Sequence, residues 1–404
     1  MATAQTELPP GEGKVTGQYA LTWEQQEILE QADRFAREKL HHLQERMDKE
    51  EWWPEGVLAE CAELGYLGLT APEKWGGADM DLFESMLVAQ SFAKWNPAFA
   101  LSWGTHENLC LNNILRNASE EQCDRYLPKL CRGEWTGALA LTEPGAGSDA
   151  LLGMRTTATR DGDNYILNGR KMYITNGSIA DVILVYAKTS MEDGAKGISA
   201  FIVETTVSGF SVAQRLSKMG MRGSPTAELV FDDCVVPARN RVMAENEGVA
   251  VVMSGLDIER ALVGPMCVGM AERALELSID YARERKQFGK SIGSFQMIQA
   301  KLADMYAFLE SMRAMAYATV SRCNDLERGA GGRGNIHKLT AATALHCATH
   351  CMKILDEAVQ IHGGFGFMAE TEVNRLYRAG KLLEIGAGTN EVRRVIIAEE
   401  LLRG

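Results

Sequence analysis

The order in which hydrophobic periodicities follow one another is the feature that most restricts how this chain folds. From residue 21 to about 130, apolar residues recur at helical spacing, and residues 23–40 are strongly amphipathic. From about Thr136 the chain changes to short β-rich runs separated by Gly, Asn and Asp, and beyond Glu247 the helical spacing returns. This order predicts an α+β protein of several domains. It excludes a doubly wound sheet, in which strands and helices alternate.

With 404 residues, the chain exceeds the ~250–300 residues at which a single core stops growing. We predict a flexible N-terminal extension (1–20), an N-terminal α-helical domain (21–136), a middle antiparallel β domain (137–246) and a C-terminal α-helical domain (247–404). The expected strands are 165–167, 172–174, 182–186, 198–203 and 229–231. The expected C-terminal helices are 249–270, 273–286, 295–326, 336–361 and 390–402, with a helix–helix connection at 329–334.

Charge and cysteine content narrow the class of partner. Acidic residues outnumber basic ones by 54 to 42, and the resulting charge of −12 disfavours nucleic acid and anionic membranes but permits a local basic pocket. Nine cysteines without a CxxC pair indicate reduced thiols. No signal or transit pattern is found, and no apolar run approaches the ~20 residues that span a bilayer. We therefore expect a cytoplasmic protein that binds small molecules or proteins, although a processed protein of an organelle matrix would show the same features.

A glycine-rich segment, LALTEPGAGSD, stands at residues 139–149, where the β-rich part begins. Gly145 and Gly147 allow the backbone to approach a ligand closely, and Thr142 and Ser148 offer donors for a pyrophosphate or a flavin edge. A plain glycine turn explains the segment equally well from the residues alone.

The same segment resembles the flavin-binding signature of the acyl-CoA dehydrogenase family. The resemblance continues, in family order, through RKMYITNG (170–177), SKMGMRGSPTAELVFDDCVVP (217–237), RERKQFGKSIGSFQ (283–296), IHGGFGF (361–367) and KLLEIGAGTNEVRR (381–394). It implies helical, β and four-helix-bundle domains, FAD as cofactor and an acyl-CoA thioester as substrate. It further implies an electron-transfer flavoprotein as electron acceptor and a homotetramer, because the family FAD site borrows residues from a neighbouring subunit.

The resemblance also assigns FAD contacts. Tyr173 stands where relatives carry Trp or another aromatic, and an aromatic ring there can stack on the flavin. Arg285 and Gln296 resemble contacts to FAD from the neighbouring subunit, and Arg suits forked phosphate recognition. The full expected set is Leu139, Leu141, Thr142, Gly147, Ser148, Tyr173, Ile174, Thr175, Arg285, Gln287, Phe288, Gln296, Gln360, Ile361, His362, Gly363, Gly364, Thr389, Asn390 and Glu391.

Three charged residues, Asp257, Glu259 and Arg260, interrupt an otherwise apolar helical stretch. The pattern alone slightly favours a carboxylate that pairs with Arg260 or faces solvent; the alternative is a carboxylate whose pKa is raised by an apolar cavity, as a base for a carbon acid requires. Many relatives place their catalytic Glu at the position of Ala387, which cannot serve. A subgroup typified by isovaleryl-CoA dehydrogenase carries it in an LDLER-like helix, and LDIER here implies that Glu259 is the base.

The resemblance implies that Glu259 removes the α proton while the β hydrogen leaves as hydride to flavin, giving a trans-2-enoyl-CoA. The backbone N–H of Ala387 would stabilise the enolate oxygen. An acyl-CoA oxidase remains an alternative within the flavin class. The expected substrate contacts are Ser148, Ala195, Lys196, Ala250, Asp257, Ile258, Arg260, Gly386, Ala387 and Gly388.

The small side chains at Gly386 and Ala387 favour a short branched acyl chain such as isovaleryl. Ala250 replaces a Tyr and Glu107 replaces a Ser of the subgroup, so the acyl pocket or its mouth is expected to differ. A longer isoprenoid (citronellyl-like) or an aryl-substituted acyl group is the alternative substrate.

A different class of function is suggested by HCATHC, in which His346 and His350, and likewise Cys347 and Cys351, lie four residues apart on a predicted helix. Such spacing can present metal ligands. The two columns point about 100° apart, and no second ligand cluster is found, so we expect no metal site and a packing face instead.

Overall fold

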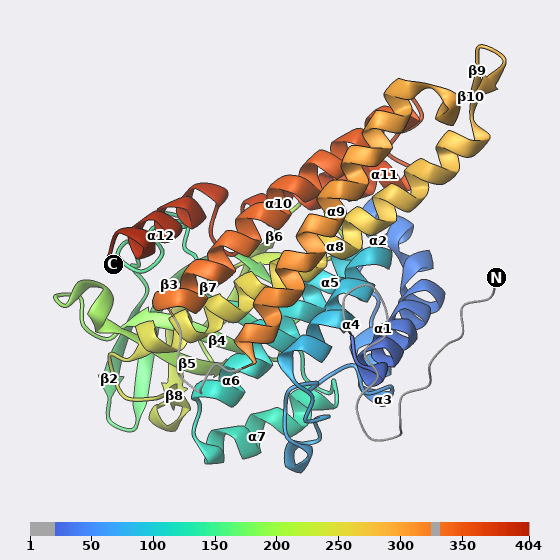
Figure 1. Ribbon diagram of the computed structural model, residues 1–404. Helices are drawn as coiled ribbons and strands as arrows, with labels where there is room; N and C mark the ends of the chain where they lie inside the picture. The colour runs from blue at the N-terminus through green and yellow to red at the C-terminus, as the bar shows by residue number, and fades with distance from the viewer. Residues whose placement is uncertain (1–20, 325–331, 404) are drawn as a thin grey trace, which may run out of the picture.

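The computed structural model describes residues 21–324 and 332–403. The predicted extension at 1–20 and the first half of the predicted connection at 329–334 lie outside this part. Within it, helices come first, a β-sheet follows and long helices end the chain (Figure 1), which confirms the predicted order. None of the helices in the described residues is long and apolar enough to cross a bilayer.

The N-terminal domain is a set of helices and short helical turns. Four of its helices begin where a side chain caps a free N–H group: Thr22, Asp81 and Ser119 do so in reciprocal capping boxes, and Asn96 does so alone. Its elements are α1 (Trp23–Phe35), the π-helical η1 (Ala36–Leu40), η2 (His41–Leu43), α2 (Gln44–Glu50), α3 (Val57–Glu63), η3 (Glu73–Trp75), α4 (Leu82–Trp95), α5 (Pro97–Gly104), the π-helical η4 (Thr105–Leu111), α6 (Asn112–Asn117) and α7 (Glu120–Cys131).

The middle domain is a sheet of eight strands with the order β6-β7-β3-β2-β4-β5-β8, and β1 pairs with β4. Its strands are β1 (Gly137–Ala140), β2 (Thr157–Asp161), β3 (Asn164–Thr175), β4 (Val182–Lys188), β5 (Ile198–Glu204), β6 (Phe210–Arg215), β7 (Thr226–Pro237) and β8 (Arg241–Val242); η5 (Gly194–Gly197) precedes β5, and η6 (Ala238–Asn240) precedes β8.

Most neighbouring strands of the sheet are antiparallel, as predicted, and β2 meets β4 in parallel at a single residue pair. The main exception is β1, which runs parallel to β4. A long segment separates these two strands, so no hairpin forces them to be antiparallel. Two predicted strands also merge into the single β3. The strands β2 and β6 were missed because their sequences, TATRD and FSVAQR, are mostly exposed and lack an alternating apolar pattern.

In the C-terminal domain, three long helices lie side by side (Figure 1): α8 (Gly248–Glu284), α9 (Gln296–Cys323) and α10 (Gly334–His362). The two helices predicted at 249–270 and 273–286 are one, and Pro265 lies inside it. Two short helices, α11 (Glu372–Gly380) and α12 (Asn390–Leu402), pack against α10. The other elements are the hairpin of β9 (Lys286–Gln287) and β10 (Lys290–Ser291), η7 (Ile292–Ser294) and η8 (Lys381–Glu384).

The N-terminal and C-terminal helices share one hydrophobic core. They approach each other closely at Gly269 of α8, where a Cβ would lie 2.1 Å from the carbonyl oxygen of Gln90 in α4. Any side chain at Gly269 would force the two helices apart. The helix α8 is therefore fixed against the N-terminal domain on one side, and its first half reaches the sheet on the other.

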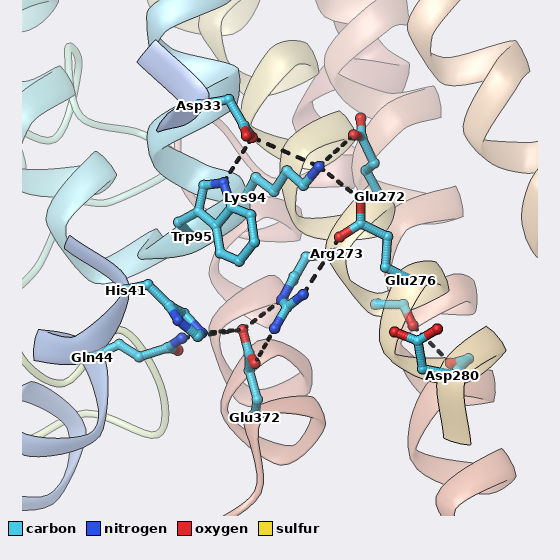
Figure 2. Close-up of polar contacts among 12 residues, drawn as sticks. Asp33, His41, Gln44, Lys94, Trp95, Glu272, Arg273, Glu276, Asp280 and Glu372 are labelled. Carbon is cyan, nitrogen blue, oxygen red and sulfur yellow. Dashed lines mark hydrogen bonds and ion pairs between the residues drawn. The ribbon is translucent and has the colours of Figure 1, made fainter. Parts of the chain in front are cut away.

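Ion pairs reinforce this contact (Figure 2). Lys94 of α4 extends between Asp33 of α1 and two carboxylates of α8, with distances of 2.7 Å to Glu272 and to Glu276 and 3.7 Å to Asp33. Burial lowers the pKa of the Lys94 ammonium, and the glutamates outweigh that effect, so its pKa is raised. The positive charge of Lys94 is thus compensated by the two glutamates in the folded state.

In a second cluster in Figure 2, Glu372 connects α11 to α8 and to the N-terminal elements η2 and α2. The two guanidinium nitrogens Nε and Nη2 of Arg273 each donate to Glu372 at 2.9 Å, and His41 and Gln44 approach the same carboxylate at 3.2 and 3.1 Å. Burial raises the pKa of Glu372, but the hydrogen bonds from His41 and Arg273 and their charges outweigh it and lower the pKa to about 2.

Replacing Glu372 by Gln is therefore expected to destabilise the fold by about 3 kcal/mol at pH 7, because a pKa lowered from 4.5 to about 2 corresponds to roughly that free energy. A depressed pKa stabilises the fold fully above the ordinary value near 4.5, and this contribution is lost as the pH falls toward about 2. Urea unfolding should show the difference between wild type and variant shrinking from pH 5 to pH 3. The control Glu50→Gln, which removes an exposed pair with Arg46, should cost about 0.5 kcal/mol or less. A difference that does not vary with pH would contradict this account.

Candidate active site

Glu259 lies on the first half of α8, where the helix passes from the sheet to the helical layers. Burial raises the pKa of its carboxyl, and the charges of Arg260 and Arg393 lower it by less, so the net shift is upward. Within residues 21–324 and 332–403, no hydrogen bond or ion pair to this carboxylate is found. A half-buried carboxyl with a raised pKa and no fixed partner is suited to accept a proton.

Asp257, by contrast, has partners for both of its carboxylate oxygens. Its carboxylate is fully buried; one oxygen lies 2.7 Å from His337 Nδ1 and 3.4 Å from Arg260 Nη1, and the other accepts the N–H of Gly332 at 2.6 Å. Since the carboxylate accepts, His337 carries its proton on Nδ1. Arg260 thus pairs with Asp257, and the structural explanation that the sequence left open for Glu259 belongs to Asp257 instead.

The turn after η8 lies beside this group. Arg260 Nε donates to Ala387 O at 3.3 Å, and Arg393 Nη2 donates to Gly386 O at 2.7 Å. Ala387 has φ of +56° and Gly388 has φ of +85°. A non-glycine residue in the left-handed region costs about 1 kcal/mol or more and is typical of functional sites.

The other residues expected to contact substrate are spread around α8. Ile258 is buried in the shared core, whereas Ala250 is exposed at the start of the helix. Ala195 and Lys196 belong to η5, which contacts α8.

Most of the residues expected to contact the flavin ring gather at β1 and β3. Leu139, Leu141 and Thr142 form the end of β1 and the segment after it, and Met172 N donates to Thr142 O at 2.9 Å. Tyr173 in β3 is 69% exposed and has φ of +62°, so its ring stands free of the sheet. Ile174 is buried beneath it. Thr175 follows Ile174 in the same strand, and Gly147 and Ser148 lie exposed in the adjoining loop.

The remaining expected FAD contacts fall into two groups. Thr389, Asn390 and Glu391 begin α12, and Thr389 caps the helix. Arg285, Gln287, Phe288, Gln296, Gln360, Ile361, His362, Gly363 and Gly364 gather at the far tip of the long helices, around the β9–β10 hairpin (Figure 1). There His362 stacks on Tyr281 with ring centroids 4.3 Å apart, and Phe288 is 92% exposed. One chain therefore does not bring the tip group to β1 and β3.

Comparison with known proteins decides the family. Models of the acyl-CoA dehydrogenase N-terminal, middle and C-terminal domains match residues 22–134, 138–234 and 246–402. The chain belongs to the acyl-CoA dehydrogenase family. It is 41% identical to the mitochondrial isovaleryl-CoA dehydrogenase of Arabidopsis thaliana over 382 residues, covering 94% of this chain and 91% of the relative. It is 40% identical to the mitochondrial 2-methylacyl-CoA dehydrogenase of Solanum tuberosum over 382 residues, covering 94% and 90%. The solved structure of butyryl-CoA dehydrogenase from Megasphaera elsdenii matches with a TM-score of 0.91 and 35% identity, covering 96% of this chain and all of that one.

This acyl-CoA dehydrogenase is thus an oxidoreductase, and members of its family bind FAD and act on acyl-CoA. The loop between β1 and β2 is open enough for a cofactor to lie against it. Neither Gly145 nor Gly147 has a positive φ, and a Cβ at either would meet no atom within 4 Å. The chain's own conformation and packing do not require these glycines, whereas a ligand against the loop would.

Sequence reasoning missed the buried ion pair that supports this loop. Lys171 of β3 is fully buried, and its Nζ lies 2.9 Å from Glu143 Oε1 and 3.0 Å from Leu141 O. Glu143 also accepts the N–H groups of Arg155 and Thr156 at 2.7 and 3.0 Å. The signal was present, because Lys171 lies on the same face of β3 as the buried Tyr165 and Leu167. A charge at an inward position needs a partner.

Glu107, which replaces a Ser of the subgroup, is buried and hydrogen-bonded to the backbone. Its two carboxylate oxygens accept the N–H groups of Gly68 and Leu69 at 2.8 and 2.7 Å, and burial raises its pKa to about 7. Glu107 therefore holds the loop after α3. Its neighbour His106 accepts the N–H of Gly137 at Nδ1 and donates from Nε2 to Leu130 O, at 3.0 and 3.1 Å, which ties η4 to β1.

In HCATHC, the two cysteines and the two histidines lie in different environments. Cys347 and Cys351 are buried, and Cys347 Sγ contacts Met312 O at 3.7 Å. His346 and His350 lie on the other side, where His346 Nε2 is 3.1 Å from Ser311 Oγ. In the described residues, no group of three potential metal ligands is assembled.

Proposed function

We propose that this chain is an FAD-dependent dehydrogenase of a short branched acyl-CoA such as isovaleryl-CoA, with Glu259 as the base. The observation that carries the proposal is the difference between the two carboxylates of LDIER: Asp257 is saturated by three partners, and Glu259 has a raised pKa and no fixed partner. Ala387, at the position where many relatives have their base, offers no side chain for proton transfer.

In the proposed reaction, the Glu259 carboxylate takes the proton from the carbon α to the thioester. Bound FAD would supply the hydride acceptor for the β hydrogen, which would make the product a trans-2-enoyl-CoA. The N–H of Ala387 donates to the thioester oxygen, where negative charge develops as the α proton leaves. Tyr173 covers the flavin site and restricts water. The electrons then pass to an electron-transfer flavoprotein.

The separation of the expected FAD contacts supports a homotetramer. Arg285 and Gln296 are exposed at the tip of the long helices, away from Tyr173 and the loop at Gly147. In the proposed assembly, the tip of one subunit completes the FAD site of its neighbour. An exposed arginine at the tip is suited to a pyrophosphate.

Anaerobic titration of the FAD-loaded protein with a panel of acyl-CoAs tests the proposal. We expect isovaleryl-CoA and 2-methylbutyryl-CoA, added in stoichiometric amounts, to bleach the absorbance of the bound flavin. Citronellyl-CoA and 3-phenylpropionyl-CoA should bleach it more slowly. Faster bleaching by either of the latter two would overturn the proposed acyl chain. A protein that stays colourless after addition of FAD would overturn the proposed activity. Rapid reoxidation by oxygen would identify an oxidase.

A further inference from the structure

The peptide between Gly386 and Ala387 is held from its carbonyl side by a buried arginine. Arg393 of α12 is fully buried, and its Nη2 donates to Gly386 O at 2.7 Å. The carbonyl and the N–H of a trans peptide point in opposite directions. By fixing Gly386 O, Arg393 therefore fixes the direction of the Ala387 N–H.

The position of Arg393 is itself tightly defined. Its Nη1 donates to Leu383 O at 2.9 Å, to Asn390 Oδ1 at 2.9 Å and to Ala344 O at 3.3 Å. No carboxylate in the described residues lies within ion-pair distance of Arg393. Burying a cation without a paired carboxylate is unfavourable, and here four oxygen acceptors compensate the charge only in part.

The next peptide of the turn is held in the same manner, because Arg260 Nε donates to Ala387 O at 3.3 Å. Two buried cations thus fix successive carbonyls on either side of a residue in the strained left-handed conformation. Strain of this kind persists where the surroundings over-determine it. Within the described residues, the Ala387 N–H donates to no protein acceptor, and it remains available to a ligand.

We propose that Arg393 is a positioning residue for the dehydrogenation: its guanidinium orients and polarises the Gly386–Ala387 peptide, so that the Ala387 N–H stabilises the enolate oxygen of the thioester. The inference rests on the function proposed above. A charged donor on the carbonyl withdraws electron density from the peptide, and the N–H of the same peptide becomes a stronger donor because successive hydrogen bonds polarise one another. Arg393 touches no substrate atom. Its charge also acts through space, because it lowers the pKa of Glu259, so the ionisation of the bound ligand, in which Glu259 need not take up a proton, is the readout that isolates the effect on the peptide.

The test uses the FAD-loaded enzyme and three variants. Arg393→Gln removes the charge, Arg393→Lys keeps the charge but cannot serve Gly386 O and Leu383 O with a fork, and Arg403→Gln is the control at the exposed end of the same helix. Acetoacetyl-CoA, whose α carbon is acidic, serves as the probe. Its ionisation in the site is followed against pH by the long-wavelength absorbance that an enolate gives beside oxidised flavin. Thermal unfolding and FAD content are measured in parallel.

We expect Arg393→Gln to raise the apparent pKa of bound acetoacetyl-CoA by about one unit and to slow flavin reduction by about 10- to 100-fold, less than the loss of an oxyanion donor. Arg393→Lys should give an intermediate shift, and Arg403→Gln none. An unshifted ligand pKa in a folded, FAD-loaded Arg393 variant would overturn the inference. If Arg393→Gln does not load FAD, Arg393→Lys decides the question by the same measurement. If the wild type itself ionises no acyl-CoA probe, the proposed function fails, and the inference fails with it.

Discussion

Replacing Glu259 by Gln is expected to slow flavin reduction by about 10²- to 10⁴-fold, the range that a positioned general base contributes. Glutamine has nearly the same shape, so it should leave acyl-CoA binding in place, but its amide cannot take up the α proton. Stopped-flow reduction of the FAD-loaded protein by isovaleryl-CoA measures the rate. The perturbation of the flavin spectrum by a non-reacting thioether analogue measures binding.

The control for this substitution is Glu121→Gln, the same change at an exposed position of α7, which should reduce flavin at the wild-type rate. The pH profile gives a second check. The pKa of Glu259 is raised by burial, so in the free enzyme the rate should fall as the pH drops through a value above 4.5, where the base becomes protonated. That limb should be absent from Glu259→Gln. Undiminished flavin reduction in Glu259→Gln would remove this residue from the mechanism.

The pairing of the charges in LDIER was within reach of the sequence. Residues three apart on a helix face each other and adjacent ones do not, so the spacing favours Asp257 with Arg260 over Glu259 with Arg260. The structure shows this pair at 3.4 Å. The sequence alone left open which carboxylate has a structural partner, because it could not reveal which residues lie opposite each of them. His337 and Gly332, which complete the environment of Asp257, are far away along the chain.

Arg393 shows the opposite case. Its partners are the carbonyls of Ala344, Leu383 and Gly386 and one amide oxygen, and every residue type carries a backbone carbonyl. No pattern of side chains can announce such contacts. From the sequence alone, two adjacent arginines on a helix indicate a face exposed to solvent. Only the fold shows that Arg393 is buried and Arg394 is exposed.

The same reasoning explains the sheet. The order of domains follows from periodicity, which each segment carries locally. The parallel pairing of β1 with β4 depends on where the chain joins the sheet at the start of β1. Contacts with other elements hold that point, such as the hydrogen bond from Gly137 N to His106 in η4. Local patterns could therefore predict most of the strands with buried faces, although not β1, and they could not predict the pairing partners.

Replacing Asp257 by Asn is expected to destabilise the fold by about 3–5 kcal/mol, the usual cost of removing one partner of a buried ion pair. Arg260 is 4% exposed and would keep its charge without a counterion. The asparagine oxygen could accept from His337 or from Gly332, while its NH₂ group would face the other donor. Chemical unfolding monitored by circular dichroism measures the loss. The control Asp280→Asn lies on the same helix with a side chain that is 69% exposed, and should cost about 1 kcal/mol or less.

The Asp257 variant also separates stability from catalysis. Arg260 joins Asp257 to the Ala387 carbonyl, so its release should loosen the turn at Gly386–Gly388 and slow flavin reduction, while the Glu259 side chain itself is retained. Below its melting temperature, Asp257→Asn should therefore reduce flavin more slowly than Asp280→Asn. Equal stability of the two variants would mean that Arg260 finds another partner. Equal rates would mean that the Arg393 contact alone suffices to orient the Ala387 amide.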